Sequence, residues 1–79
     1  MTPADFDAWL AHMGLSERAA AAKLGCSAAT VGNLRRGINY NTGKPMAIDR
    51  RTALACAALA AGLDEWQADA QPMRQAWLR

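Results

Sequence analysis

The residues from Gly14 to Gly37 read GLSERAAAAKLGCSAATVGNLRRG, and this stretch decides how the chain is expected to fold. Ser16 and Ser27 each precede a run of helix-forming residues, and serine is a favoured N-terminal cap. Gly25 and Gly37 follow the two runs, where a glycine in the left-handed conformation commonly ends a helix. The stretch therefore predicts two short helices joined by a turn of about three or four residues.

Two helices joined in this way form a helix-turn-helix, here over residues 16–36. In this motif the second helix lies in the major groove of DNA, so its outward side chains must be small or polar. The helices also cross closely, and Ala21, Gly25 and Val31 stand where small or well-packed residues are needed. The residues expected to face the bases are Ser27, Ala28, Ala29, Thr30, Gly32 and Asn33.

The residues expected to face the bases differ in the contacts that they can make with DNA. Asn33 can form two hydrogen bonds with adenine, although it could instead face solvent. Thr30 could read a base or stabilise its own turn, whereas Ala28 and Ala29 offer only apolar contact. Gly32 costs a helix about 1 kcal/mol relative to alanine, so it is either tolerated or allows close approach to the groove.

Positive charge is concentrated in the middle of the chain. Residues 27–51 contain five basic residues and one acidic residue, a net +4, whereas the remainder contains four basic and six acidic residues, a net −2. This asymmetry indicates either a face that binds polyanions or a solvated helix surface. The residues expected at or near the DNA backbone are Arg35, Arg36, Asn39, Tyr40, Asn41, Thr42, Lys44, Arg50 and Arg51. The loop among them, residues 38–45, could also be a solvated connector.

The rest of the chain is also predicted to be helical, since alanine is abundant and no run alternates apolar and polar residues as a half-buried strand does. Thr2 should cap a first helix, a fourth helix should begin at residues 46–48 and run to Gly62, and Asp64 with Gln67 resembles a capping box for a fifth. Residues 1–79 should therefore form one all-α domain, a compact bundle of about five short helices.

The stretch from Gly14 to Gly37 resembles the helix-turn-helix of the phage-repressor and Cro-like (XRE) transcription regulators. It matches their spacing of Gly-Leu-Ser/Thr, Ala, Leu-Gly-x-Ser, Thr-Val/Ile and a terminal Gly without a gap. Residues 45–66, PMAIDRRTALACAALAAGLDEW, are similar to the fourth helix and the start of the fifth in small bacterial members. The resemblance implies a lambda-repressor-like fold and a homodimer that binds double-stranded DNA.

Glu17 and Arg35 are among the residues that depart from the family pattern. Glu17 stands where many members carry a glutamine that touches a phosphate, and its carboxylate would repel DNA. Arg35 replaces a commonly acidic residue, so a guanine or phosphate contact becomes possible there.

The C-terminal part, residues 63–79, is the candidate dimerisation segment. It carries more apolar bulk than a small five-helix core needs, and large aromatic residues commonly dominate interfaces. Packing against Trp9 is the alternative. The residues concerned are Leu63, Trp66, Met73, Trp77 and Leu78.

Several classes of function are not expected. Cys26 and Cys56 form no CxxC pair and have only His12 as an imidazole partner, so we expect two reduced, buried thiols, no metal, no cofactor, no small-molecule ligand and no enzyme activity. No leader and no apolar run of roughly 20 residues is present, which indicates a cytoplasmic protein without membrane contact. The predicted function is a sequence-specific transcriptional regulator, most simply a repressor. The alternative is an antitoxin-like or adaptor helical module that binds an acidic protein partner.

Overall fold

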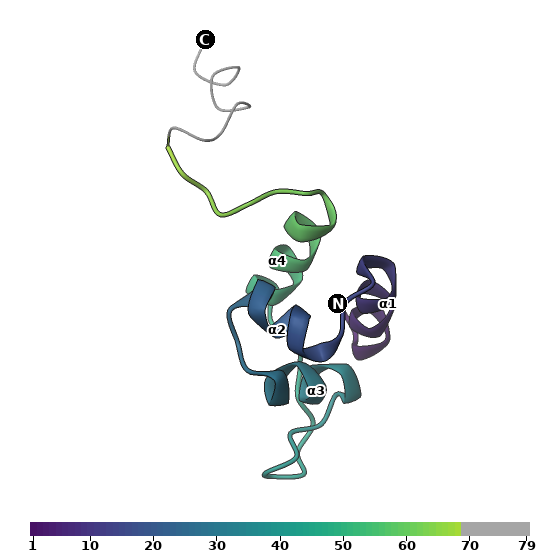
Figure 1. Cartoon of the computed structure of the whole chain (residues 1–79). Helices are drawn as coiled ribbons and strands as arrows, with labels where there is room; N and C mark the ends of the chain where they lie inside the picture. Colours follow the sequence, from purple (N-terminus) through teal and green to yellow (C-terminus); the bar gives the residue numbers. More distant parts are fainter. Residues whose placement is uncertain (69–79) are drawn as a thin grey trace.

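The structure is a computed structural model that describes residues 1–68. Within this range the chain forms four α-helices and no β-strand, which confirms the all-α prediction. The helices follow one another closely except for a long connection before the fourth, and they pack together as Figure 1 shows. They are α1 (Pro3–Met13), α2 (Glu17–Leu24), α3 (Ala28–Arg36) and α4 (Arg50–Ala60).

The ends of the first three helices follow the predicted signals. The hydroxyls of Thr2, Ser16 and Ser27 accept hydrogen bonds from backbone N–H groups in the first turns of α1, α2 and α3. At the end of α2, Gly25 adopts a φ of 75°, a left-handed conformation that residues with a Cβ rarely take. Because of this turn, only three residues separate α2 from α3.

The hydrophobic core lies where the four helices meet. Phe6 is fully buried, and its ring centroid lies 5.5 Å from that of Trp9. The Trp9 indole Nε1 donates a hydrogen bond of 2.9 Å to the carbonyl oxygen of Cys56, which ties α1 to α4. Small residues on α2 allow α3 to pack closely against it. The buried set is Phe6, Trp9, Leu10, Ala20, Ala21, Val31, Leu34 and Cys56.

The fourth helix begins later than predicted. Residues 46–48 precede α4, and Asp49 caps the helix by accepting a hydrogen bond of 2.9 Å from the Thr52 N–H group. Met46 and Ile48 pack against the core from the connection, so their apolar character reflects this packing rather than a helical face. The predicted start was therefore wrong by about one helical turn, and α4 ends at Ala60 rather than Gly62.

The predicted start of a fifth helix was wrong for the residues that the structure describes. Residues 63–68 are not helical, although Asp64 and Gln67 have capping-box spacing. A helix from Asp64 would reach Pro72 after two turns, and a helix this short needs packing to be stable. Within residues 63–68 the large apolar side chains, Leu63 and Trp66, are instead mostly exposed.

Candidate nucleic-acid interface

The exposed N-terminal end of α3 carries small side chains, as predicted for a helix that must enter a groove. Ser27, Ala28 and Ala29 are exposed, whereas Val31 and Leu34 on the opposite side are buried in the core. The apolar side of α3 therefore packs in the core, and the start of α3 presents only small side chains to solvent.

Thr30 contributes to the start of α3 through local hydrogen bonds. Its backbone N–H donates to the Ser27 hydroxyl at 3.1 Å, and the two hydroxyl oxygens lie 2.9 Å apart. Thr30 is also partly buried. Of the two roles considered for this residue, these contacts support the structural one.

Gly32 is not open to solvent. It is buried, and a Cβ built at this position would lie 2.8 Å from Arg36 Nη2 and 3.3 Å from Glu17 Oε1. The missing side chain therefore makes room for two charged groups of the same protein. The expectation that Gly32 is one of the outward-facing, base-reading positions does not fit this environment.

Arg36 turns from α3 toward the loop. Its guanidinium carbon lies 4.3 Å from the centroid of the Tyr40 ring, a cation–π contact. Both side chains are exposed, so the guanidinium keeps contact with solvent. The stack restricts the orientation of a cation at the end of α3.

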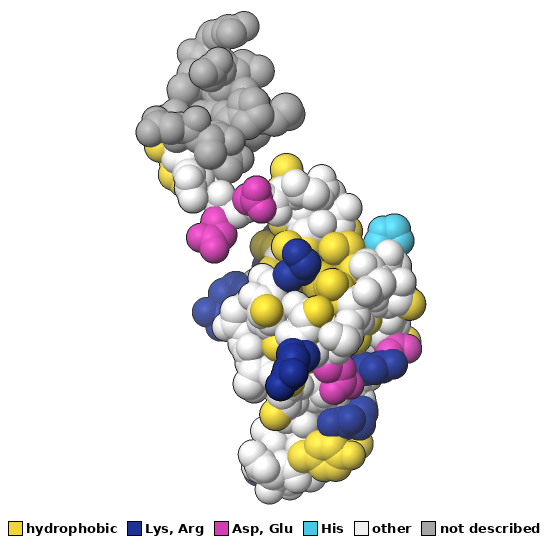
Figure 2. Space-filling view, viewed as in Figure 1, with side chains coloured by type: hydrophobic (Ala, Val, Ile, Leu, Met, Phe, Trp, Pro, Cys, Tyr) yellow, Lys and Arg dark blue, Asp and Glu magenta, His cyan; other side chains and the backbone are white. Residues whose placement is uncertain are grey.

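Arg35, the neighbouring residue, is held by two carboxylates. Its Nε donates to Asp7 Oδ1 of α1 at 2.5 Å, and its Nη1 donates to Glu17 Oε2 of α2 at 3.3 Å. The hydrogen bond and charge of Asp7, and then those of Glu17, raise the pKa of Arg35 above its ordinary value. Figure 2 shows acidic and basic side chains lying next to one another on this part of the surface. No local pattern identifies Asp7 as a partner of Arg35, because the two residues lie 28 positions apart in the sequence.

The loop between α3 and α4 has a defined shape. Ile38 and Pro45 form an isolated antiparallel bridge, and the loop projects beyond the helices in Figure 1. Every backbone N–H from residue 39 to residue 44 donates to an oxygen of residues 33–44. Since these amides are already used, contacts from the loop to a phosphate would have to come from side chains.

The exposed side chains of this loop include potential phosphate ligands. Tyr40, Asn41, Thr42 and Lys44 are exposed, and the Thr42 hydroxyl also accepts a hydrogen bond from the Lys44 N–H group. Asn39 is partly buried and accepts hydrogen bonds from the loop itself. Asn39 therefore shapes the loop, Tyr40, Asn41 and Lys44 face outward, and Thr42 does both.

Asn33 links α3 to this loop. It is partly buried, and its Oδ1 accepts a hydrogen bond of 3.4 Å from the Tyr40 N–H group. A carboxamide oxygen has two lone pairs and the adjacent nitrogen has two donor hydrogens, so the contact leaves capacity for a base edge. The contact fixes the side chain relative to the loop.

The basic residues around the loop differ in their partners. Arg51 Nη2 lies 3.2 Å from Asp49 Oδ2, and hydrogen bonds from Thr52 and Arg51 hold the pKa of Asp49 below its ordinary value. Within the part of the chain that the structure describes, Arg36, Lys44 and Arg50 form no ion pair. These three cations occupy the end of α3, the loop and the first residue of α4.

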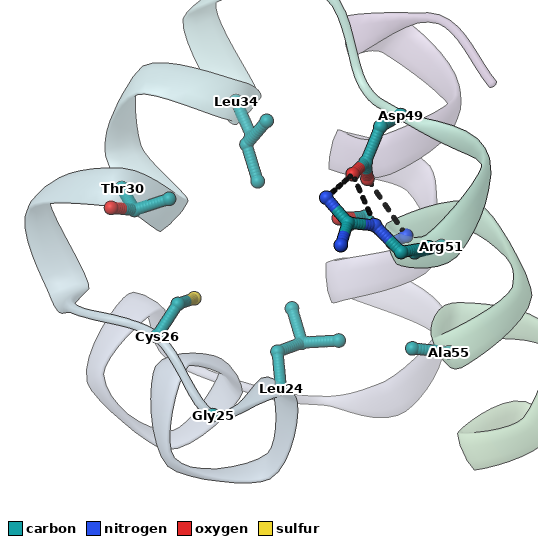
Figure 3. A pocket seen from close by; sticks show the side chains of 9 residues that line it. Leu24, Gly25, Cys26, Thr30, Leu34, Asp49, Arg51 and Ala55 are labelled. Atoms are coloured by element: carbon teal, nitrogen blue, oxygen red, sulfur yellow. Dashed lines mark hydrogen bonds and ion pairs between the residues drawn. The ribbon is translucent and has the colours of Figure 1, made fainter.

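A pocket of about 410 Å³ lies between the α2–α3 turn and the start of α4. Leu24, Leu34 and Cys26 point into it, and the Arg51–Asp49 pair lies at its edge (Figure 3). Cys26 is exposed, which corrects the expectation of two buried thiols, while Cys56 is buried. Partial desolvation raises the pKa of both thiols, so the protonated form is favoured.

The candidate dimerisation residues are only partly described. Leu63 is 56% exposed and Trp66 is 67% exposed, so within residues 1–68 neither belongs to the core. The other three predicted residues, Met73, Trp77 and Leu78, lie outside the described residues.

The described residues contain no group of three or more His, Cys, Asp or Glu side chains arranged to hold a metal ion. None of the helices in residues 1–68 combines the length and the apolar character needed to cross a membrane. Comparisons with protein-family models, with curated protein sequences and with solved structures found no match to this chain.

Proposed function

We propose that this chain is a sequence-specific, double-stranded DNA-binding transcriptional regulator of the XRE type, acting as a homodimeric repressor. In this proposal α2, the turn at Gly25 and α3 form the helix-turn-helix, and α3 enters the major groove. One observation carries the proposal: the exposed start of α3 has only small side chains, and it is followed by Arg36, Lys44 and Arg50. These three cations have no ion-pair partner in the described residues.

The dimensions of DNA explain why this combination favours nucleic acid. A helix with its side chains is about 10–12 Å wide and the major groove is about 12 Å wide, so the fit is close, and small side chains at the start of the helix let its backbone approach the bases. Ser27, Ala28 and Ala29 have such side chains. A protein-binding helix would gain more from large apolar side chains at these exposed positions.

The cations supply the attraction to the DNA backbone. Arg36 is the last residue of α3, Lys44 lies in the loop that follows, and Arg50 is the first residue of α4. Phosphate contacts fix the position of a protein on DNA, whereas base contacts select the sequence. We assign the backbone role to these cations and to the outward-facing loop side chains, and the base-reading role to Asn33, Ser27 and the two alanines.

A homodimer accounts for selection of one genomic site. One recognition helix reads few base pairs, whereas two related by a two-fold axis read half-sites about 34–36 Å apart. Leu63 and Trp66 are large, exposed and follow the helix bundle, so we assign them to the interface. A dimer bound to such an operator would exclude polymerase from an overlapping promoter.

The division between base and backbone contacts can be tested with two variants. A preferred site would be selected from genomic fragments, and affinities for this site and for random duplex would be measured by gel shift. Arg36→Ala should weaken binding to both DNAs equally. Asn33→Ala should cost roughly 1–3 kcal/mol on the preferred site and flatten discrimination at one base pair. Equal losses on both DNAs for Asn33→Ala would remove Asn33 from the base-reading role.

A further inference from the structure

Three charged residues from three helices meet beside the candidate interface. Asp7 of α1 and Glu17 of α2 both accept hydrogen bonds from Arg35 of α3, at 2.5 and 3.3 Å. The two carboxylates and one guanidinium give this triad a net charge of −1. Arg35 also precedes Arg36, a cation that has no carboxylate partner among residues 1–68.

We propose that Asp7 and Glu17 set the DNA affinity of this protein by competing with phosphate for Arg35. The inference rests on the proposed DNA binding and adds a role for two acidic residues on α1 and α2. In the free protein the carboxylates occupy the Arg35 guanidinium, so a phosphate must displace them before it can contact this cation. This competition lowers the affinity for DNA.

The exposure of the triad makes this competition possible. The side chains of Arg35, Asp7 and Glu17 are 47%, 53% and 36% exposed. Ion pairs with this much solvent contact contribute little to stability, so Arg35 can leave its partners without unfolding the protein. When a phosphate approaches α3, the Arg35 guanidinium is already hydrogen-bonded to Asp7 and Glu17, so the phosphate must displace these carboxylates.

The effect should not depend on DNA sequence. Phosphates are present at every base pair, so a cation that is released to contact them strengthens binding to all sequences. The carboxylates would thus reduce the time that the protein spends on random DNA without changing which site it prefers.

The test compares Asp7→Ala with Asp64→Ala, which removes the same charge. Asp64 lies in the segment after α4, and this segment and the loop are at opposite ends of the described chain in Figure 1. Affinity for a random duplex would be measured between 50 and 200 mM salt. Asp7→Ala should bind more tightly than the native protein and Asp64→Ala. Its advantage should be about 3.5-fold larger at 50 mM than at 200 mM salt per released arginine, because each added phosphate contact makes the log-log salt slope more negative by about 0.9.

A second background identifies Arg35 as the source of the gain. In an Arg35→Gln protein, Asp7→Ala should produce no more gain than Asp64→Ala. Glu17→Ala should raise affinity in the same direction as Asp7→Ala, which provides an independent variant if one of them folds poorly.

The outcomes separate this inference from the proposed function. Native protein that binds DNA, with Asp7→Ala no tighter than Asp64→Ala, would overturn the competition and leave DNA binding standing. A lower melting temperature with unchanged affinity would assign the triad a purely structural role. A gain that persists with Arg35→Gln would also refute the inference. Native protein that binds no DNA at any salt concentration would overturn both.

Discussion

The guanidinium of Arg36 lies 4.3 Å from the centroid of the Tyr40 ring, four residues further along the chain. This contact joins the last residue of α3 to the projecting loop, while the Tyr40 N–H group donates to Asn33 Oδ1 from the same loop. Two contacts that span Gly37 therefore hold helix and loop together. A protein that places α3 in a groove and the loop along the backbone would use such a link to keep their relative position.

Replacing Tyr40 should weaken DNA binding without affecting the fold. An exposed cation–π contact contributes about 0.5–1 kcal/mol, so Tyr40→Ala should lower affinity about two- to fivefold per protomer by releasing Arg36 from its preferred orientation. Tyr40→Phe keeps the ring and should bind nearly as well as the native protein. Tighter binding by Tyr40→Ala in a gel-shift titration would mean that the stack withholds Arg36 from DNA.

Gly32→Ala should affect stability and binding in opposite directions. Alanine favours the helix by up to about 1 kcal/mol relative to glycine, which should raise the free energy of unfolding. The new Cβ would lie 2.8 Å from Arg36 Nη2, so this flexible group must move away. Denaturant unfolding should give an equal or higher free energy of unfolding. A DNA titration should show weaker binding, because Arg36 is displaced from its position. A clear loss of stability would show that the surroundings of Gly32 cannot adjust.

The salt dependence should report the three cations that we assign to the DNA backbone. If Arg36, Lys44 and Arg50 each neutralise one phosphate, a homodimer neutralises about six, and the log-log salt slope should be about −5. Arg36→Ala should reduce its magnitude by about 2. Asp7→Ala releases Arg35 and should therefore make the log-log salt slope steeper, at about −7. A slope near zero would be inconsistent with binding through the DNA backbone.

The oligomeric state should depend on Trp66, which is 67% exposed. Trp66→Ala should dimerise more weakly and lose affinity for a palindromic site much more than for random DNA, because only the palindrome requires both recognition helices. Sedimentation at micromolar concentration, with and without DNA, would measure this. Native protein that stays monomeric in both states, with one chain per site, would rule out the dimer.

Local signals predicted the first three helices well because each signal acts within its own turn. Thr2, Ser16 and Ser27 cap neighbouring N–H groups, and the glycine at the end of each helix adopts its left-handed conformation independently of the rest of the fold. The close packing expected at Val31 is likewise confirmed, since this residue is fully buried.

The predictions that were wrong or incomplete are of two kinds. Some concern side chains whose partners are distant in the sequence, and others concern a sequence pattern that fits two different structures. Met46 and Ile48 are apolar because they cover the core, not because they belong to α4. The capping-box spacing of Asp64 and Gln67 does not start a helix within residues 63–68. No local pattern shows that Arg35 meets Asp7, nor that Arg36 occupies the space beside Gly32.

The sequence-specific DNA binding that we propose for this chain can be measured by a competition titration of the native protein. The two competitors are its best genomic fragment and a random duplex of equal length, at about 0.15 M salt. The predicted result is a preference of at least about 10³ for the selected fragment, typical of specific regulators. Equal affinity for the two duplexes would contradict sequence-specific regulation, and absence of binding to both would contradict the account and favour an acidic protein partner.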